Sequence, residues 1–369
     1  MPQSTDKKLL SARETEDRPL RSHTMRPVVT VPIFAIQGLL DGARIKGLAT
    51  PEWLENVLGR AGISESLLEL KDSRVTVEQF NALFIAVKDS LNDECLGYLH
   101  ERPMRPGSFA LMARSTLGAK TLGAALSRLA GSFALLQDDV TLVPVSEGSL
   151  SGVALQMNGG PGTHDDFLHG MLLRVFWRLL VWLHGDRLVP QRFDFNFSPP
   201  PHAVSYGLIF PGTVRFGQPR TAIWFDASAF KHPVRRDWEA LHSFLRATPG
   251  NLIGPHLNER NASARVRMVL QRAIPEWPDL GITAQRLHMS VSTLQRHLAA
   301  EGTSFQALKD QLRRDMAIVR LTSSDASHAA IAADLGFTDS TAFQRAFKVW
   351  TGSAPGAYRA RSRSGQHPT

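Results

Sequence analysis

Hydrophobic and polar positions follow two patterns before about residue 250 and one pattern after it. Up to about residue 133, apolar residues recur mainly at helical spacing, whereas residues 140–157 alternate with a period of two around a turn at 147–149. A second pair of strands is expected at 192–197 and 215–225. Beyond about residue 255 only helical spacing is found. The sequence therefore predicts an α+β N-terminal domain followed by an all-α C-terminal domain.

Three local signals place elements in the N-terminal part. Residues 28–36 are mostly apolar and partly β-branched, which favours a short strand. Thr50 and Pro51 open a helix, with the threonine as N-cap and the proline in the first turn. Between residues 75 and 99 the pattern predicts a helix with one apolar face. That face carries Phe80, Leu83, Val87, Leu91 and Leu96.

Glycine and proline are concentrated in residues 247–255, which is typical of a linker between domains. The chain length fits two domains, which we expect over 26–250 and 257–361. Residues 1–25 and 362–369 are polar and are expected to be tails, with Met25 as an alternative start.

The C-terminal part contains an internal repeat. Residues 294–298 (LQRHL) recur 49 positions later as 343–347 (FQRAF), in the order apolar, Gln, Arg, any residue, apolar. Upstream, residues 284–289 (AQRLHM) match 332–337 (AADLGF) at an offset of 48. Each copy is therefore predicted to be a short helix, a tight turn and a second helix, and the turn is one residue longer in the second copy.

One position in each turn has a special backbone requirement. Gly336 permits a positive φ in the second copy, whereas His288 holds the matching place in the first, where glycine is more usual. We therefore expect the first turn to differ in geometry or to carry strain.

Polar positions of the second helix in each copy are expected to face outward. A helix in the major groove reads bases with such side chains, because Arg pairs with guanine, Gln with adenine, and Ser or Thr with bases or phosphates. An ordinary helical bundle also exposes polar residues, but the same pattern on both sides of a spacer favours DNA reading. The candidate DNA-binding residues are Ser292, Thr293, Gln295, Arg296 and His297 in the first copy and Ser340, Thr341, Gln344, Arg345 and Lys348 in the second.

A spacer helix is predicted over residues 305–321, with one apolar stripe along its length. Seventeen residues span about 25 Å, which is near the ~34 Å between successive major grooves on one face of DNA. Gly302 ends the preceding helix, and Thr303 or Ser304 caps the spacer. Two recognition helices from one chain would then reach adjacent grooves.

These residues resemble the AraC/XylS family of bacterial transcription regulators over about 259–359. The resemblance implies that residues 257–361 bind promoter DNA through two helix-turn-helix units, and that Pro355 stabilises the fold after the second recognition helix. The matching residues are Ile331-Ala332, Leu335-Gly336-Phe337, Ser340, Phe343, Arg345, Phe347-Lys348, Trp350-Thr351-Gly352, Pro355 and Tyr358-Arg359. The sequence departs from the family pattern at His328, Thr283 and Val291, which puts local stability in question.

The N-terminal domain is similar to the ligand-binding domain of a subgroup that includes regulators of ornithine catabolism. The matching pieces are 107–109 (GSF), 121–126 (TLGAAL), 182–185 (WLHG), 199–206 and 233–235 (PVR). This resemblance implies a domain that senses a small-molecule effector and forms a homodimer, in a protein that works with RNA polymerase. The alternative is an effector-independent or partner-controlled DNA-binding protein whose N-terminal domain only dimerises.

Composition and charge agree with this interpretation. The chain of 369 residues carries a net charge of +8, and the part from His256 onward holds 15 Lys and Arg against 9 Asp and Glu. That concentration is expected of a nucleic-acid-binding domain, although a basic solvated face would also produce it. Cys95 is the single cysteine, which excludes an intrachain disulfide and favours a reducing, cytoplasmic location.

The most apolar stretch, residues 171–183, is too short for a membrane span and is interrupted by two arginines. It is expected to form a mostly buried helix with a basic stripe. Arg174, Trp177, Arg178 and Trp182 on this helix are candidate effector-binding residues for a ligand that bears a carboxylate, with packing against the core as the alternative.

Enzyme chemistry finds no support in the sequence. The densest group of candidate metal ligands is His164, Asp165, Asp166 and His169, which lacks a metal-ligand spacing and is better explained by helix N-capping. Residues 148–152 (GSLSG) have leucine where a nucleophilic serine would stand. We therefore expect no catalytic residue, no metal site and no cofactor.

Overall fold

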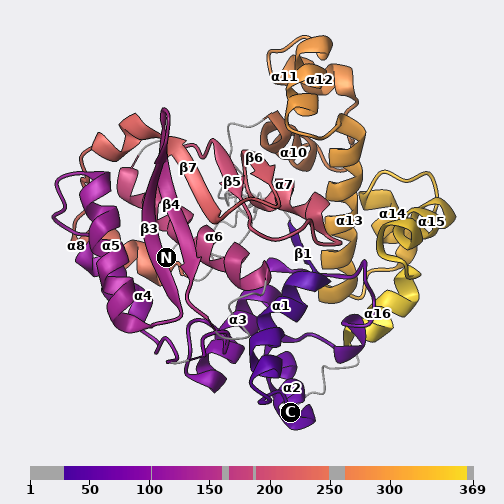
Figure 1. Ribbon diagram of the computed structural model, residues 1–369. Coiled ribbons are helices and arrows are strands. Elements are labelled where there is room, and N and C mark those ends of the chain that lie inside the picture. Colours follow the sequence, from indigo (N-terminus) through magenta and orange to yellow (C-terminus); the bar gives the residue numbers. More distant parts are fainter. Residues whose placement is uncertain (1–28, 101, 160–165, 186–187, 249–261, 364–369) are drawn as a thin grey trace, which may run out of the picture.

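The computed structural model describes residues 29–100, 102–159, 166–185, 188–248 and 262–363. In Figure 1 a body of strands and helices fills the left and centre, and a group of helices lies along its right side. Buried apolar side chains form one cluster that runs from Val31 in the body to Tyr358 in the helical group. The α+β part and the all-α part are therefore packed against each other.

A five-stranded sheet in the order β3-β4-β7-β5-β6 forms the centre of the N-terminal part. All neighbouring strands are antiparallel except β5 and β6, which are parallel. The strands are β3 (Val140–Glu147), β4 (Leu150–Met157), β5 (Arg192–Asp194), β6 (Thr213–Arg215) and β7 (Thr221–Asp226). The predicted hairpin is confirmed with Gly148 and Ser149 as its turn, because Glu147 pairs with Leu150.

Gly152 of β4 is paired with Trp224 of the neighbouring strand β7. A Cβ atom at Gly152 would lie 1.9 Å from the Ile223 carbonyl oxygen, so the strands could not approach this closely with a larger residue. The predicted second pair is present, since β5 and β7 pair with Phe193 opposite Ile223, but its bounds are wrong. The strand expected over 192–197 ends at Asp194, and the strand expected over 215–225 begins only at Thr221. The intervening strand β6 extends the sheet at its edge.

Helices cover the sheet and build most of the core. The longest N-terminal helix, α6 (Asp166–His184), is buried along most of its length and contacts β7 and α5. The predicted basic stripe is therefore largely inside the protein. The other helices around the sheet are α4 (Ser108–Ser115), α5 (Leu122–Leu136), α7 (Tyr206–Ile209) and α8 (Trp238–Arg246).

A smaller unit is formed by a two-stranded sheet and three helices. The strands are β1 (Thr30–Pro32) and β2 (Arg74–Thr76), and the helices are α1 (Ile33–Ile45), α2 (Pro51–Ala61) and α3 (Val77–Leu91). The predicted cap is confirmed, because the Thr50 hydroxyl accepts a hydrogen bond from the Trp53 amide. In Figure 1 this unit lies below the sheet, and β1 points toward the helical group.

Two predicted boundaries in this unit are wrong. The strand expected over 28–36 is only three residues long, because Pro32 has a helix-compatible φ of −66° and Ile33 begins a buried helix. The helix expected over 75–99 ends at Leu91, where Asn92 takes a left-handed φ of 53°. Leu96 is buried, but it lies in a turn with a φ of 57° rather than on the helix.

Within residues 262–363 of the described chain there are seven helices, in agreement with the predicted all-α architecture. They are α10 (Ala262–Arg272), α11 (Leu280–Arg286), α12 (Val291–Ala300), α13 (Phe305–Ser323), α14 (His328–Asp334), α15 (Ser340–Thr351) and α16 (Pro355–Arg363). Helix α13 runs along the body, with α11 and α12 at one end and α14 and α15 beside it (Figure 1). Most of the predicted linker, residues 249–255, lies outside the described residues.

Candidate nucleic-acid interface

The first helix-turn-helix unit is α11 and α12. The Asp279 carboxylate caps α11 by accepting a hydrogen bond from the Ile282 amide, and the Ser290 hydroxyl caps α12 by accepting one from the Thr293 amide. On the inner side of α12, the side chains of Leu294 and Leu298 are fully buried. One side of α12 is thereby fixed against α11 and α10, and the other side faces solvent.

The second unit, α14 and α15, repeats this construction. Ser327 caps α14, and Asp339 caps α15 by accepting a hydrogen bond from the Ala342 amide. Phe343 and Phe347 replace the two buried leucines of the first unit, and neither is exposed. The structure thus confirms the repeated helix-turn-helix fold that the sequence predicts.

The two turns share the expected left-handed residue. Gly336 has a positive φ of 68° as predicted. His288 has a φ of 55°, so the first turn does not differ in this backbone angle, and the strain of a left-handed residue other than glycine is the expectation that applies. The histidine side chain is exposed, which leaves room for it despite the unfavourable backbone.

Eight of the ten predicted DNA-binding residues are exposed. They are Ser292, Gln295, Arg296, His297, Thr341, Gln344, Arg345 and Lys348. The other two, Thr293 and Ser340, are half-buried: the Ser290 hydroxyl donates a hydrogen bond to Thr293, and the Gln344 side-chain amide donates one to Ser340. Ser292, Gln295 and Arg296 occupy the same places on α12 as Thr341, Gln344 and Arg345 on α15.

The spacer α13 begins at Phe305 as predicted, capped by Ser304, but it ends at Ser323 rather than at Leu321. Nineteen residues correspond to about 28 Å. Gly302 has a φ of 71° and ends the first unit as expected.

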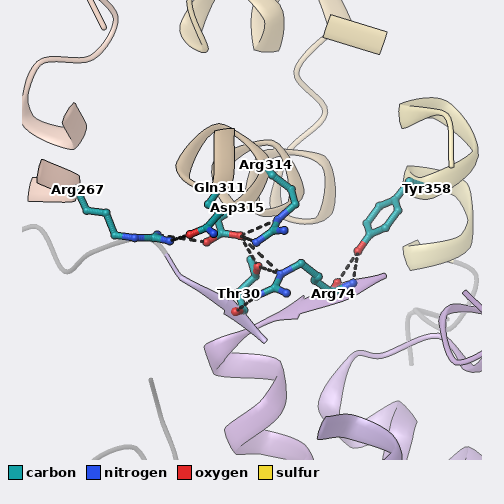
Figure 2. Close-up of polar contacts among 7 residues, drawn as sticks. All are labelled: Thr30, Arg74, Arg267, Gln311, Arg314, Asp315 and Tyr358. Carbon is teal, nitrogen blue, oxygen red and sulfur yellow. Dashed lines mark hydrogen bonds and ion pairs between the residues drawn. The ribbon is translucent and has the colours of Figure 1, made fainter. Parts of the chain in front are cut away.

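A buried polar cluster that the sequence did not reveal joins the two parts of the chain. Asp315 on α13 is 1% exposed and accepts a 2.6 Å hydrogen bond from the Thr30 hydroxyl of β1. Arg74 of β2 donates to the same hydroxyl at 2.6 Å and lies 3.7 Å from the carboxylate. Figure 2 shows the Thr30 and Arg74 side chains next to each other on one side of the aspartate.

Two more arginines complete the cluster. Arg314 donates to Asp315 at 3.2 Å, and Arg267 on α10 lies 3.7 Å from its other oxygen. At the edge of the cluster, Tyr358 on α16 donates a hydrogen bond to the Arg74 carbonyl (Figure 2). The cluster therefore links β1, β2, α10, α13 and α16.

Burial opposes charge in this cluster. It lowers the pKa of Arg74 to about 10, assisted by the nearby Arg314, and it lowers the pKa of Arg267. It also raises the pKa of Tyr358 to about 12. The arginines stay charged at neutral pH, so a single carboxylate balances three buried or half-buried cations.

A cavity of about 900 Å³ adjoins the cluster between the N-terminal part and α10, α12 and α13. Its lining includes the cluster residues Arg74, Arg267 and Arg314, and also Arg174 of α6. Aromatic and aliphatic side chains form the remainder of one wall: Phe34, Phe80, Phe167, Met171 and Phe210. The carboxylates of Asp41, Asp166, Glu301 and Asp315 also line it. The cavity therefore combines cationic, anionic and apolar surface, in the size range of small-molecule sites.

The structure separates the four predicted effector-binding residues. Only Arg174 lines this cavity, and burial together with Arg178 lowers its pKa to about 9. Trp177 packs edge-on against Phe193 in the core, and Trp182 stacks on Phe244 at a ring distance of 4.7 Å. Arg178 lies beside Trp177, 5.9 Å from its ring. Core packing, the alternative interpretation, accounts for both tryptophans.

The candidate metal ligands Asp166 and His169 lie on α6. His164 and Asp165 of the densest ligand group lie outside the described residues, whereas the His169 ring is hydrogen-bonded to the Thr221 hydroxyl at 2.8 Å. Among the described residues, no three His, Cys, Asp or Glu side chains are grouped to hold a metal ion. No helix in the described part of the chain has the length and apolar character needed to cross a membrane.

Two family models match the chain, one in each part. The first is described as the arabinose-binding domain of the AraC transcription regulator, N-terminal, and matches residues 54–234. The second is described as a helix-turn-helix domain and matches residues 283–361. The order of the two models along the chain is the order of the two parts of the fold.

Individual relatives agree with this assignment. The ornithine utilization regulator of Pseudomonas aeruginosa is 25% identical over 89% of this chain and 96% of its own length. The HTH-type transcriptional regulator VqsM of the same species is 26% identical over 49% of this chain and 52% of its own length. Among solved structures, that of the transcriptional regulator CdpR from P. aeruginosa is 19% identical over 89% of this chain and 98% of CdpR, with a TM-score of 0.30.

Proposed function

Because this chain belongs to the AraC family of transcription regulators, we propose that it reads promoter DNA with α12 and α15 in successive major grooves. It is a DNA-binding transcription regulator with an arabinose-binding-like N-terminal domain, and its relatives are a non-enzymatic family. We assign residues 26–250 to sensing or dimerisation and 257–361 to DNA binding. One observation carries the proposal: two copies of the same exposed polar pattern lie on two helices joined by a rigid spacer.

The proposed contacts follow from the chemistry of the exposed side chains. Arg296 and Arg345 pair with guanine, and Gln295 and Gln344 pair with adenine. Hydroxyl and basic side chains at the helix ends contact bases or phosphates and fix the register of the protein on the duplex. These are Ser292, Thr293, His297, Ser340, Thr341 and Lys348.

Selection of preferred sites from a random duplex library by the full chain tests this proposal. Interference by methylation of guanine N7 on the selected DNA then maps major-groove contacts. We expect two contact patches on one face of the duplex, about 10 base pairs apart. A single patch, or a library in which no site is enriched, would contradict the use of both units.

We further propose that the cavity beside Asp315 holds an effector with an anionic group and an apolar body. Four arginines line the cavity together with four carboxylates. Arg267 is 8% exposed, and its buried Nη1 makes no hydrogen bond to the described residues, although it lies 3.7 Å from the Asp315 carboxylate. A carboxylate is the group that arginine binds most specifically, and the aromatic wall suits an apolar body. Such a ligand would contact both parts of the chain and shift the population of DNA-competent states.

Thermal unfolding with a panel of organic acids, amino acids and fatty acids tests this effector proposal. The pair 4-phenylbutyrate and 4-phenylbutyramide separates the charge of the ligand from its apolar body. We expect the acid to raise the unfolding temperature and the amide to raise it less, and the Arg174→Gln variant to lose the difference. Equal effects of acid and amide would refute an anion site. No shift with any compound favours the alternative, a regulator whose N-terminal domain only dimerises.

Dimerisation and contact with RNA polymerase in the cytoplasm complete the proposal. Large apolar side chains on α4, α5 and α8 are more than half exposed, namely Leu111, Leu135 and Trp238. Exposed apolar side chains of this kind mark interaction sites, and we propose that a second copy of the chain covers Leu111, Leu135 and Trp238. Light scattering of the wild type and of Leu135→Lys tests this: a monomeric wild type would exclude the dimer.

A further inference from the structure

The segment between α10 and α11 reaches across the spacer helix to the second unit. Trp277 in this segment is 5% exposed, and its indole Nε1 donates a 3.0 Å hydrogen bond to the Asp334 carbonyl at the end of α14. On the spacer, Lys309 donates hydrogen bonds to the carbonyls of Trp277 at 3.0 Å and Pro278 at 3.4 Å. Trp277 is therefore held by both α13 and α14, although it lies just ahead of the first unit in the sequence.

Arg313 of the spacer lies near two aromatic rings, that of Trp277 ahead of the first unit and that of Phe337 in the second unit. Its guanidinium carbon is 4.9 Å from the Trp277 ring centre and 5.0 Å from the Phe337 ring centre. The same group donates a 3.3 Å hydrogen bond to the Gly336 carbonyl in the turn of the second unit. Cation–π contacts with two rings at once hold the segment, the spacer and the turn together.

The turn of the second unit is shaped for this contact. A Cβ atom at Gly336 would lie 2.6 Å from the Trp277 Cδ1 atom, so only glycine fits beneath the indole. The first unit has His288 at the matching position, with the same left-handed backbone but an exposed side chain. Trp277 itself has a φ of 45°, which is rare for a bulky residue. Strain of this kind persists where surrounding contacts impose it.

We propose that Trp277 and Arg313 are positioning residues that fix the first helix-turn-helix unit relative to the second, and thereby set the spacing of the two DNA half-sites. This inference rests on the proposed binding of both units to one duplex. One extra base pair moves a half-site by about 3.4 Å and rotates it by about 34°. Two rigidly joined units accept one spacing, whereas loosely joined units accept several and bind each with lower avidity.

Binding of the full chain to a set of duplexes tests the inference. The set contains the site selected by the wild type, the same site with one base pair inserted or deleted between the half-sites, and a duplex with the second half-site alone. The test variants are Trp277→Ala and Arg313→Met. Trp350→Leu is the matched control, because Trp350 also packs on Phe337, at a ring distance of 6.0 Å, but belongs to the second unit.

The wild type is expected to lose roughly tenfold or more in affinity for each altered spacing. Each test variant is expected to bind the selected site about tenfold more weakly, with a spacing penalty below about threefold and an unchanged affinity for the single half-site. The control is expected to weaken binding to the half-site and to the full site in parallel, and to keep the spacing penalty. If Trp277→Ala does not fold, Arg313→Met carries the test.

An unchanged spacing penalty in Arg313→Met would overturn the inference while leaving DNA binding by both units intact. A parallel loss on the half-site and on the full site would also overturn it, because both residues would then merely support the fold of one unit. Failure of the wild type to select any two-part site would instead refute the proposed function on which the inference rests.

Discussion

Arg296 and Arg345 stand two residues after a buried apolar side chain, at equivalent places on α12 and α15. Both are exposed, and their neighbours Gln295 and Gln344 are exposed as well. Neither guanidinium belongs to the buried cluster at Asp315 or to the contacts of Trp277. These arginines are therefore available to DNA, and replacing them is expected to leave the fold nearly unchanged.

Arg345→Ala is expected to weaken binding to the selected site by about 1–3 kcal/mol and to relax the preference at one base pair, because a bidentate contact with guanine is lost. Titration of the selected duplex and of a scrambled duplex measures this. Lys348→Ala serves as the comparison, since loss of a phosphate contact weakens both duplexes alike. An equal loss on the two duplexes for Arg345→Ala would assign it to phosphate binding instead.

Sequence reasoning predicted that the candidate recognition residues face outward, and eight of the ten are exposed, because an internal repeat shows which helix positions are equivalent. It could not find the Asp315 cluster, in which Thr30 and Asp315 are 285 residues apart in the chain. It also grouped Arg174 with Trp177, which is buried against Phe193, and with Trp182, which is half-buried and stacks on Phe244, since arginine and tryptophan on one helix give no signal of which neighbour buries them. Contacts at long range depend on packing, which local patterns do not encode.

At the scale of elements, the two turns make the same backbone with different residues. The exposed His288 tolerates the left-handed conformation, while Gly336 must also leave room for Trp277. A substitution at this turn position is therefore expected to have different consequences at His288 and at Gly336, and the second turn is the more constrained.

Gly336→Ala is expected to lower the free energy of unfolding by about 2 kcal/mol or more, because a left-handed alanine is strained and its Cβ meets the indole. His288→Gly is expected to change it by no more than about 1 kcal/mol, since relief of strain is offset by greater chain entropy in the unfolded state. Urea unfolding of both variants measures the difference. Similar stability of Gly336→Ala and the wild type would show that Trp277 does not press on this turn.

Element boundaries were predicted correctly where a local cap signal was used and were wrong at the end of α3, where the Asn92 cap was overlooked. Thr50 with Pro51, Ser304 and Gly302 each marked a helix end correctly, because side-chain caps and left-handed glycines are local. The helix that ends at Leu91 was extended too far, since Leu96 is buried without being helical. Hydrophobic spacing alone does not distinguish a buried turn from another helical turn.

At the scale of the whole molecule, the spacer helix is tied to the N-terminal part through one carboxylate. Asp315 receives a hydrogen bond from β1 and ion pairs from β2, α10 and its own neighbour on α13. Loss of a buried charge from such a group leaves its partners uncompensated. The cluster is therefore the natural point at which an occupant of the adjoining cavity would alter the contact between the two parts.

Asp315→Asn is expected to lower the free energy of unfolding by about 3–5 kcal/mol, because three arginines lose their counter-charge. Hydrogen exchange at neutral pH should become faster in β1 and β2, while β3 and β4 keep the rates of the wild type. Asp310→Asn on the same helix is the control and is expected to change stability by less than about 0.5 kcal/mol. Uniform acceleration over the whole chain would indicate global destabilisation rather than a released contact.

The central claim, sequence-specific binding of DNA, is tested most directly by the affinity of the full chain for its selected site and for a scrambled duplex over a series of salt concentrations. We predict affinity that falls steeply with salt and a preference of about 10³ or more for the selected site. A steep salt dependence without preference would contradict the account, because it would show a basic surface that binds phosphates while α12 and α15 read no bases.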